Sequence, residues 1–405
     1  MIKKGNLLLI VTCFVAALLR INGQAANISS TEFDVMYEDV AAYLMDPGNH
    51  PDLEHGIVEI EYGDAKAYFP QWVYTLDELE EFSASPEQMD IADEMIERYR
   101  ESFDMLEANP LRAFSDMNLL MDAAIGIEGV LRTYEHDQSP ETRDLARRYL
   151  DFAKIIAKRP RLIMGYHVEP YGPTTVIAGA AWFYLYYAHV MGPDDPKYEE
   201  HKKIGLSIIE KMDKRLYSED GKKYLYSIRS GYDFTYAYNN TVMVQALIRA
   251  YLVTGERRYY DRAIEIMGTI ERELYSPEYG GYLAAEHPSI HELRRYARHY
   301  EKIGPQYNRE YMALSSHNYM VYAYYALYEA GGFEDDELLE KAAVCLRFIR
   351  DKLWDHEGKI QHHIELGEIS PPADYCTGCN FQTLFHIVQY KAMLKKEPVM
   401  GLYGK

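Results

Sequence analysis

A helical pattern that recurs along the chain constrains its fold more than any other feature. Residues 233–283 contain an apolar helical segment, a tight turn at Thr254-Gly255, an amphipathic helical segment and a Gly-rich exit. The pattern returns at 318–359, and an earlier copy occupies 176–226. Matching positions of the two later copies lie 77 residues apart: Met243 and Met320, Ala246 and Ala323, Tyr251 and Tyr328. A long period built from paired helices is typical of helical repeat folds, and we interpret each copy as one αα-hairpin.

The rest of the chain carries further helix signals. Ser85-Pro86-Glu87 and Ser139-Pro140-Glu141 combine an N-cap, a first-turn proline and an acidic first turn, and a last helix is expected from about Asn380 to Leu394. The count is roughly twelve helices with almost no strand pattern. Six hairpins that each leave an apolar face uncovered can bury it by closing end to end.

We therefore predict an all-α fold, an (α/α)6 toroid of helical hairpins over 76–400. Segments such as 176–190 are apolar on all sides and should be inner helices, whereas charged amphipathic segments such as 257–273 should be outer helices. The alternative is an open solenoid, which needs polar capping repeats at both ends.

The N-terminal region differs from the repeats. Residues 1–26 have a basic start at Lys3-Lys4, an apolar stretch of signal-peptide length and small residues at a cleavage position. We predict a signal peptide at 1–26 and hence a periplasmic or secreted protein. Residues 27–75 are expected to form an N-terminal arm, with an amphipathic helix within 31–44.

Composition limits the partners. The formal net charge is −20, which argues against binding nucleic acid or an anionic membrane surface, because both require a basic footprint. No stretch after the signal peptide is long and apolar enough to cross a bilayer. The chain has 38 Tyr against 13 Phe. Tyr suits half-buried helix positions, but a cleft lined with Tyr also suits a carbohydrate ligand.

Functional residues are expected in the long connections between an outer helix and the next inner helix. Long connections in a compact domain are usually functional, and these lead to the N-termini of the inner helices, where free N–H groups favour oxygen-rich ligands. Four of them are visible: 161–175, 217–240, 275–318 and 354–380.

Two carboxylates in these connections are candidates for general acid/base catalysis. Asp233 lies just before an inner helix and Glu169 lies in the preceding connection. Glycoside hydrolysis needs such a pair, one group to protonate the leaving oxygen and one to activate water or attack. The structural alternatives are a helix cap for Asp233 and an ordinary surface position for Glu169.

Other side chains in the same connections complete the predicted site. His317 and Tyr236 are the assisting catalytic candidates, His317 for proton transfer. The alternative for His317 is a capping or buried histidine. Candidate substrate-binding residues are Tyr166, His167, Tyr171, Tyr238, Asn239, Asn240 and His362.

The cysteines near the C-terminus allow three interpretations, one of which leaves both thiols reduced or unpaired. In an exported protein, Cys376 and Cys379 can close a small disulfide. His362, His363, Cys376 and Cys379 also have the ligand types of a zinc site, but their spacing matches no standard zinc finger. We favour the disulfide and predict no resident cofactor.

The hairpin residues of 160–395, with the pattern MVxALIxAYxxTG followed by an amphipathic helix and a Gly-Gly exit, resemble the six-hairpin glycosidase-like superfamily. The resemblance is closest to helical domains of the N-acylglucosamine 2-epimerase type. It implies an (α/α)6 toroid and a carbohydrate-active enzyme. Members of the epimerase family use a histidine pair for proton transfer. The residues around His317, His362 and His363 differ from that family's motifs, so no catalytic role is carried over.

Three functional hypotheses follow. The leading one is an exported glycoside hydrolase acting on oligosaccharides through Asp233 and Glu169. The second is a sugar epimerase or polysaccharide lyase that transfers protons through His317, His362 or Tyr236. The third is a non-catalytic helical binding or scaffold protein.

Overall fold

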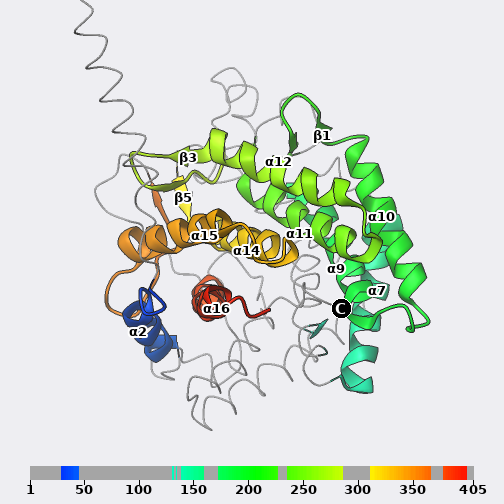
Figure 1. The fold of residues 1–405 in the computed structure, drawn as a ribbon, viewed down its shortest axis with the longest axis horizontal. Helices are drawn as coiled ribbons and strands as arrows, with labels where there is room; N and C mark the ends of the chain where they lie inside the picture. The colour runs from blue at the N-terminus through cyan, green and yellow to red at the C-terminus, as the bar shows by residue number, and fades with distance from the viewer. Residues whose placement is uncertain are drawn as a thin grey trace, which may run out of the picture.

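A computed structural model describes residues 29–44, 130–131, 134, 138–158, 172–226, 235–285, 311–365 and 377–398 (Figure 1). Three complete helical hairpins lie within these ranges. They are α9 (Gly172–Met191) with α10 (Tyr198–Asp213), α11 (Ala237–Thr254) with α12 (Arg257–Leu274), and α14 (Leu314–Ala330) with α15 (Asp336–Phe348). The predicted repeat of αα-hairpins is confirmed.

The turns inside the hairpins follow from glycine. Gly255 ends α11 with φ 71°, and Gly192 after α9 has φ 73°. This left-handed conformation is costly for other residues and is a common way to end a helix. In the third hairpin Gly332 takes the same conformation, with φ 77°.

Inner and outer helices differ as predicted. α11 packs against α9 and α14, and α14 packs against α16 (Thr377–Leu394), so these four helices follow one another along the inside. Nearly every residue of α11 and α14 is buried. α12 buries one face, with Tyr259, Ala263, Ile266 and Ile270, and exposes a charged face.

Short strands connect each outer helix to the next inner helix, which the sequence did not indicate. β1 (Tyr217–Ser218) pairs with β2 (Lys223–Tyr224), and β3 (Tyr275–Ser276) pairs with β4 (Gly281–Tyr282). β5 (Tyr311–Ala313) pairs with β6 (His363–Glu365), and a π-helical turn, η3 (Ile349–Leu353), extends α15. The mostly helical prediction holds, and strands of two or three residues are too short to show alternation in the sequence.

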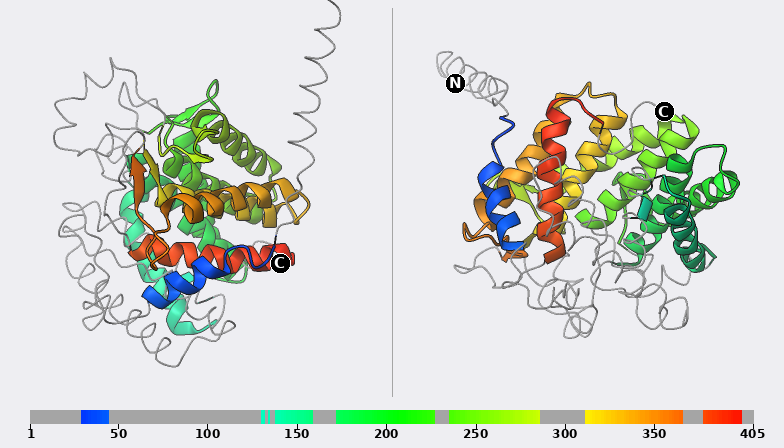
Figure 2. Two further views of the ribbon diagram at one scale, coloured as in Figure 1. Left: turned by 90° about the vertical axis from the view of Figure 1, so that its left-hand side faces the viewer. Right: turned by 90° about the horizontal axis from the view of Figure 1, so that it is seen from below.

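The N-terminal helix packs on the C-terminal one. α2 (Asp34–Leu44) lies beside α16, the blue and red helices of Figure 2, with the rings of Phe33 and Tyr390 5.3 Å apart. Lys391 Nζ is 2.5 Å from Asp34, and Arg347 of α15 donates to Glu32 at 2.8 Å. The first and the last of the described helices therefore pack against each other. The helix predicted within 31–44 is confirmed.

The remaining described helix is α7 (Pro140–Lys158), which packs on α9. It begins where predicted, and Ser139 Oγ accepts the Thr142 N–H at 3.1 Å, a typical N-cap. Within the described ranges, no helix has the length and apolarity needed to cross a membrane. The predicted signal peptide lies outside the described residues.

Candidate functional site on the inner helices

Several predicted site residues lie outside the described residues. They are Asp233, Glu169, Tyr166, His167, Tyr171 and Cys376. Their roles stay predictions. The structure places the others at the N-terminal ends of α11, α14 and α16, the end of the hairpins where the long connections arrive.

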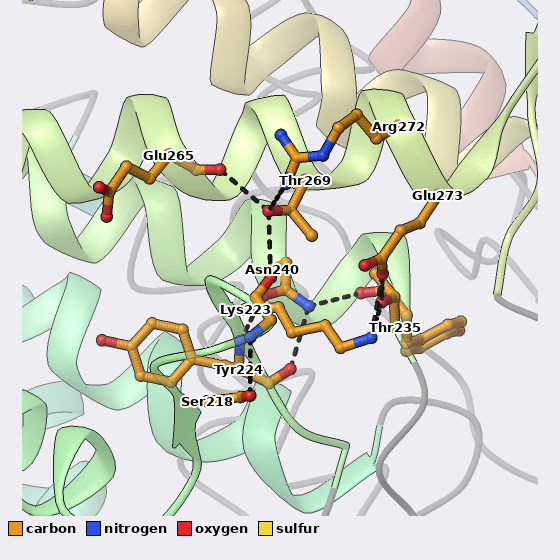
Figure 3. A network of polar contacts seen from close by, with 11 residues as sticks. Ser218, Lys223, Tyr224, Thr235, Asn240, Glu265, Thr269, Arg272 and Glu273 are labelled. Carbon is orange, nitrogen blue, oxygen red and sulfur yellow. Dashed lines mark hydrogen bonds and ion pairs between the residues drawn. The ribbon is translucent and has the colours of Figure 1, made fainter.

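Asn240 holds the backbone of the preceding strand. Its Oδ1 accepts the Tyr224 N–H at 2.8 Å, and its Nδ2 donates to the carbonyls of Tyr224 and Tyr236 at 3.1 Å each (Figure 3). Asn240 is fully buried and all of these partners are main-chain atoms. The predicted substrate-binding residue is therefore a clamp that joins β2 to α11.

His317 occupies the matching place in the next repeat, 77 residues on. Its Nε2 accepts the Tyr282 N–H of β4 at 3.0 Å, so its proton lies on Nδ1, which donates to the Ala313 carbonyl at 2.8 Å. Its ring stacks on Phe348 at 4.1 Å. Burial lowers the pKa of His317 to about 4. A neutral ring with both nitrogens bound to backbone serves as a clamp, which gives no support to the predicted proton transfer by His317.

Asn380 repeats the clamp on α16. It exchanges two hydrogen bonds of 2.8 Å with the backbone of Ile360. We call Asn240, His317 and Asn380 the strand clamps. The sequence also allowed His317 to be a capping or buried histidine, and this geometry matches that alternative.

A second polar group fixes the segment just before α11. Lys223 Nζ lies 2.7 Å from Thr235 Oγ1 and 3.0 Å from Glu273 Oε2, and Thr235 also donates to Glu273 (Figure 3). Lys223 and Thr235 are buried. This network ties β2, α12 and the entry to α11 together beside Tyr236, so the end of the connection that carries Asp233 has a firm anchor.

Tyrosine rings form a continuous row near the starts of α11 and α14. The ring centroids of Tyr226 and Tyr236 are 5.8 Å apart, those of Tyr236 and Tyr238 6.5 Å, and those of Tyr238 and Tyr319 4.2 Å. The structure thus brings the predicted residues Tyr236 and Tyr238 together. Tyr319 joins them, although the sequence did not single it out. Asn239 lies on a different face, bonded through Oδ1 to Thr175 of α9.

The exposure of α11 shows which of its faces is open. Tyr238, Val242, Gln245 and Arg249 keep 4%, 3%, 2% and 1% exposure, whereas the buried residues between them keep none. Their spacing of four, three and four residues puts all of them on one side of the helix. On α14, Tyr319 and Tyr322 are likewise the more exposed residues of the buried run.

This open side faces the inside of the row of inner helices. The rings of Trp182 on α9 and Tyr322 on α14 are 5.7 Å apart, although α11 packs between these two helices. They meet because both project inward past α11. We define the axial stripe as these inward residues together with two on α16: Trp182, Tyr238, Val242, Gln245, Arg249, Tyr319, Tyr322, Gln382 and Phe385.

Most of the axial stripe was not predicted from the sequence. Inner helices are apolar all round, so no periodicity distinguishes the inward face from the faces that contact neighbouring helices. A usable signal was the repeat itself. Trp182 precedes Gly192 by as many residues as Gln245 precedes Gly255, so an indole and an amide occupy equivalent places in an otherwise apolar copy.

The candidate zinc ligands have other contacts. His362 and His363 lie with their Nδ1 atoms 2.9 Å apart, and His363 is buried in β6. In the ranges that the structure describes, no group of three or more His, Cys, Asp or Glu side chains is placed to hold a metal. Cys379 is disulfide-bonded and Cys345 is a free buried thiol. Pairing of Cys379 with Cys376 stays a prediction.

No protein-family model and no curated protein matches this sequence, whereas solved structures do. An unsaturated glucuronyl hydrolase from Bacillus sp. GL1 is 12% identical with a TM-score of 0.58, over 87% of this chain and 96% of that one. An α-mannanase from Bacteroides thetaiotaomicron is 11% identical with a TM-score of 0.58, over 88% and 96%. A sugar epimerase from a ruminal bacterium is 11% identical with a TM-score of 0.54, over 80% and 87%.

These matches establish the fold. The chain has the fold of an (α/α)6 toroid, and the open solenoid considered from the sequence is wrong. Carbohydrate-active hydrolases, epimerases and lyases share this fold, and identities near 12% do not select among them. Members of the group have been solved with oligosaccharides, such as mannotriose on an α-1,6-mannanase.

Proposed function

We propose that this protein is a carbohydrate-active enzyme, a glycoside hydrolase that acts on oligosaccharides. The observation that carries the proposal is the row of tyrosine rings at Tyr236, Tyr238 and Tyr319, which leads into the axial stripe. Aromatic faces cover the apolar faces of sugars, while phenolic hydroxyls bond sugar hydroxyls. The structural neighbours named above, a glucuronyl hydrolase, a mannanase and a sugar epimerase, support the same class.

The proposed chemistry uses the two carboxylates predicted from the sequence. Asp233 precedes Tyr236 by three residues in the chain, and Tyr236 belongs to the tyrosine row. One of Asp233 and Glu169 would protonate the leaving glycosidic oxygen, and the other would attack or activate water. Tyr236 would orient the substrate between them.

The alternative is a sugar epimerase or a polysaccharide lyase. Because both nitrogens of His317 are bound to backbone, this alternative depends on His362 and Tyr236. The same substrates separate the three reactions: hydrolysis adds water, epimerisation keeps the mass, and lysis leaves an unsaturated sugar. A binding or scaffold protein would turn over none of them.

The test is a panel of neutral and acidic oligosaccharides assayed with the mature protein, with Asp233→Asn and Glu169→Gln as variants. We expect each variant to lose about a hundredfold or more of kcat, in the range of general acid–base catalysis. Matched controls are Asp261→Asn and Glu210→Gln, which change exposed carboxylates on outer helices α12 and α10. Wild-type rates in both site variants would remove these two residues from the mechanism, and no turnover by the wild type would remove the hydrolase.

We also propose that the protein is exported after cleavage near residue 26. The mass of the mature chain recovered from the periplasm or medium measures this directly. Recovery of the full-length chain from the cytosol alone would contradict it.

A further inference from the structure

Three buried N–H groups on inner helices have no hydrogen-bond acceptor among the residues that the structure describes, and two of them belong to the axial stripe. They are Trp182 Nε1 on α9, Gln245 Nε2 on α11 and Gln389 Nε2 on α16. Each side chain is at least nine-tenths buried. An unpaired buried donor costs roughly 1–3 kcal/mol. The two on the axial stripe, Trp182 and Gln245, require an explanation, and a bound ligand supplies one.

The unpaired groups are all donors. The indole N–H of Trp182 can only donate. Gln389 already accepts a hydrogen bond through Oε1 from the ring of His386 at 3.2 Å, so the unpaired end of its side chain is the amide N–H₂. Trp182 and Gln245 lie at equivalent places on adjacent helices, as their equal distances from Gly192 and Gly255 show. A ligand that satisfies them must present acceptor oxygens.

Arg249 is the one charged residue of the axial stripe as defined above. Arg249 lies one turn deeper than Gln245, buried, with its guanidinium carbon 3.7 Å above the ring of Tyr186 and Nη1 2.6 Å from His189 Nδ1. On the described parts of α9, α11, α14 and α16, the one acidic side chain is Glu329, which lies in the last turn of α14, seven residues beyond Tyr322 and so on the same side of that helix. Along these four helices, a carboxylate that enters from the N-terminal ends of α11 and α14 would meet Gln245 and Arg249 before Glu329, which matches position 252 in the 77-residue repeat.

We propose that the axial stripe binds a carboxylate-bearing sugar unit, with Trp182 and Gln245 donating hydrogen bonds to its carboxylate and Arg249 providing positive charge one turn deeper. The rings of Tyr238, Tyr319 and Tyr322 line the way from the ring mouth and would cover the sugar faces. This inference rests on the proposed function and narrows its substrate to uronic-acid oligosaccharides.

The test compares a glucuronate-terminated disaccharide with its neutral glucose-terminated counterpart. Calorimetric titration of the full mature chain should show at least about tenfold tighter binding of the acidic sugar. This ratio corresponds to the net free energy of one hydrogen bond to a charged group. Gln245→Glu places a carboxylate against the ligand carboxylate and should remove this preference. Gln245→Met removes the donor without charge and should reduce it about tenfold.

The outcomes separate the two proposals. Gln138→Glu, the same change at an exposed position before α7, should leave both affinities unchanged. Equal binding of the two sugars by the wild type, or an unchanged preference in folded Gln245→Met, overturns the acidic-sugar inference and leaves the hydrolase intact. Binding of neither sugar, together with no turnover on the wider panel, overturns both.

Discussion

The strand clamps and the axial stripe are two sets of buried polar side chains on the same inner helices, with opposite hydrogen bonding. Asn240, His317 and Asn380 pair completely with the backbone of the preceding strand segment. Trp182 and Gln245, on the inward face, leave donors unpaired. A buried polar group that is fully paired within the protein holds structure, whereas one left unpaired inside is available to a ligand.

This difference also separates stability from function. Clamps join each short strand to the inner helix that follows, so they fix where the long connections leave the ring. The axial stripe gains nothing for the folded state from its unpaired donors. Substitutions in the two sets should therefore act on different measurements.

The largest effect on stability is expected from Asn240→Ala. This change leaves the N–H and carbonyl of Tyr224 buried without their partner, and each lost pairing costs about 1–3 kcal/mol. Urea titration should show a free energy of unfolding lower by roughly 2–5 kcal/mol. Asn380→Ala, which removes the equivalent bonds to Ile360, is the matched comparison and should lose a similar amount. Losses below about 1 kcal/mol in both would mean that the clamps do not hold the strands.

A fall in pH should have an effect that is somewhat smaller for each histidine than that of Asn240→Ala. Burial lowers the pKa of His317 and that of His201 on α10 to about 4, below the unfolded value near 6.5. The unfolded chain then binds more protons between these values, so stability is complete above pH 6.5 and declines as the pH falls toward 4. Each histidine can contribute up to about 3 kcal/mol over that window.

Unfolding titrations at several pH values measure this decline. In His317→Asn, which places the Asn240 type of clamp in the third hairpin, the slope against pH should fall by about half, because one of the two histidines is gone. An unchanged slope would show that His317 is not buried as a neutral ring.

The sequence allowed the helices of this ring to be predicted because their signals are local and repeated. Gly255 in the left-handed region, the Ser139-Pro140 start and the amphipathic pattern of 257–273 each specify a boundary or a face. The 77-residue offset between the copies also indicated the structural role of His317. At 77 residues from Asn240 it takes the clamp position, which a comparison of copies for polar residues would have shown.

The axial stripe and the short strands have no such local signal. An inner helix touches neighbours on every side, so the inward position of Gln245 or Tyr322 depends on how the hairpins close into a ring, a non-local property. The two-residue strand at Gly281 is set by packing, since a Cβ there would lie 2.3 Å from Phe348, against which His317 stacks. Asp233 and Glu169, outside the described residues, stay predictions from connection length and residue type.

The smallest effect on stability is expected from Gln245→Leu. The Nε2 of Gln245 has no acceptor in the protein, so replacing the amide with an apolar side chain of similar size removes a desolvated donor and no protein hydrogen bond through that atom. Urea titration should give a free energy of unfolding within about 1 kcal/mol of the wild type, or slightly above it. Affinity for the acidic sugar should fall in the same variant. A loss of several kcal/mol, comparable with Asn240→Ala, would place Gln245 among the structural side chains and end the distinction between the clamps and the stripe.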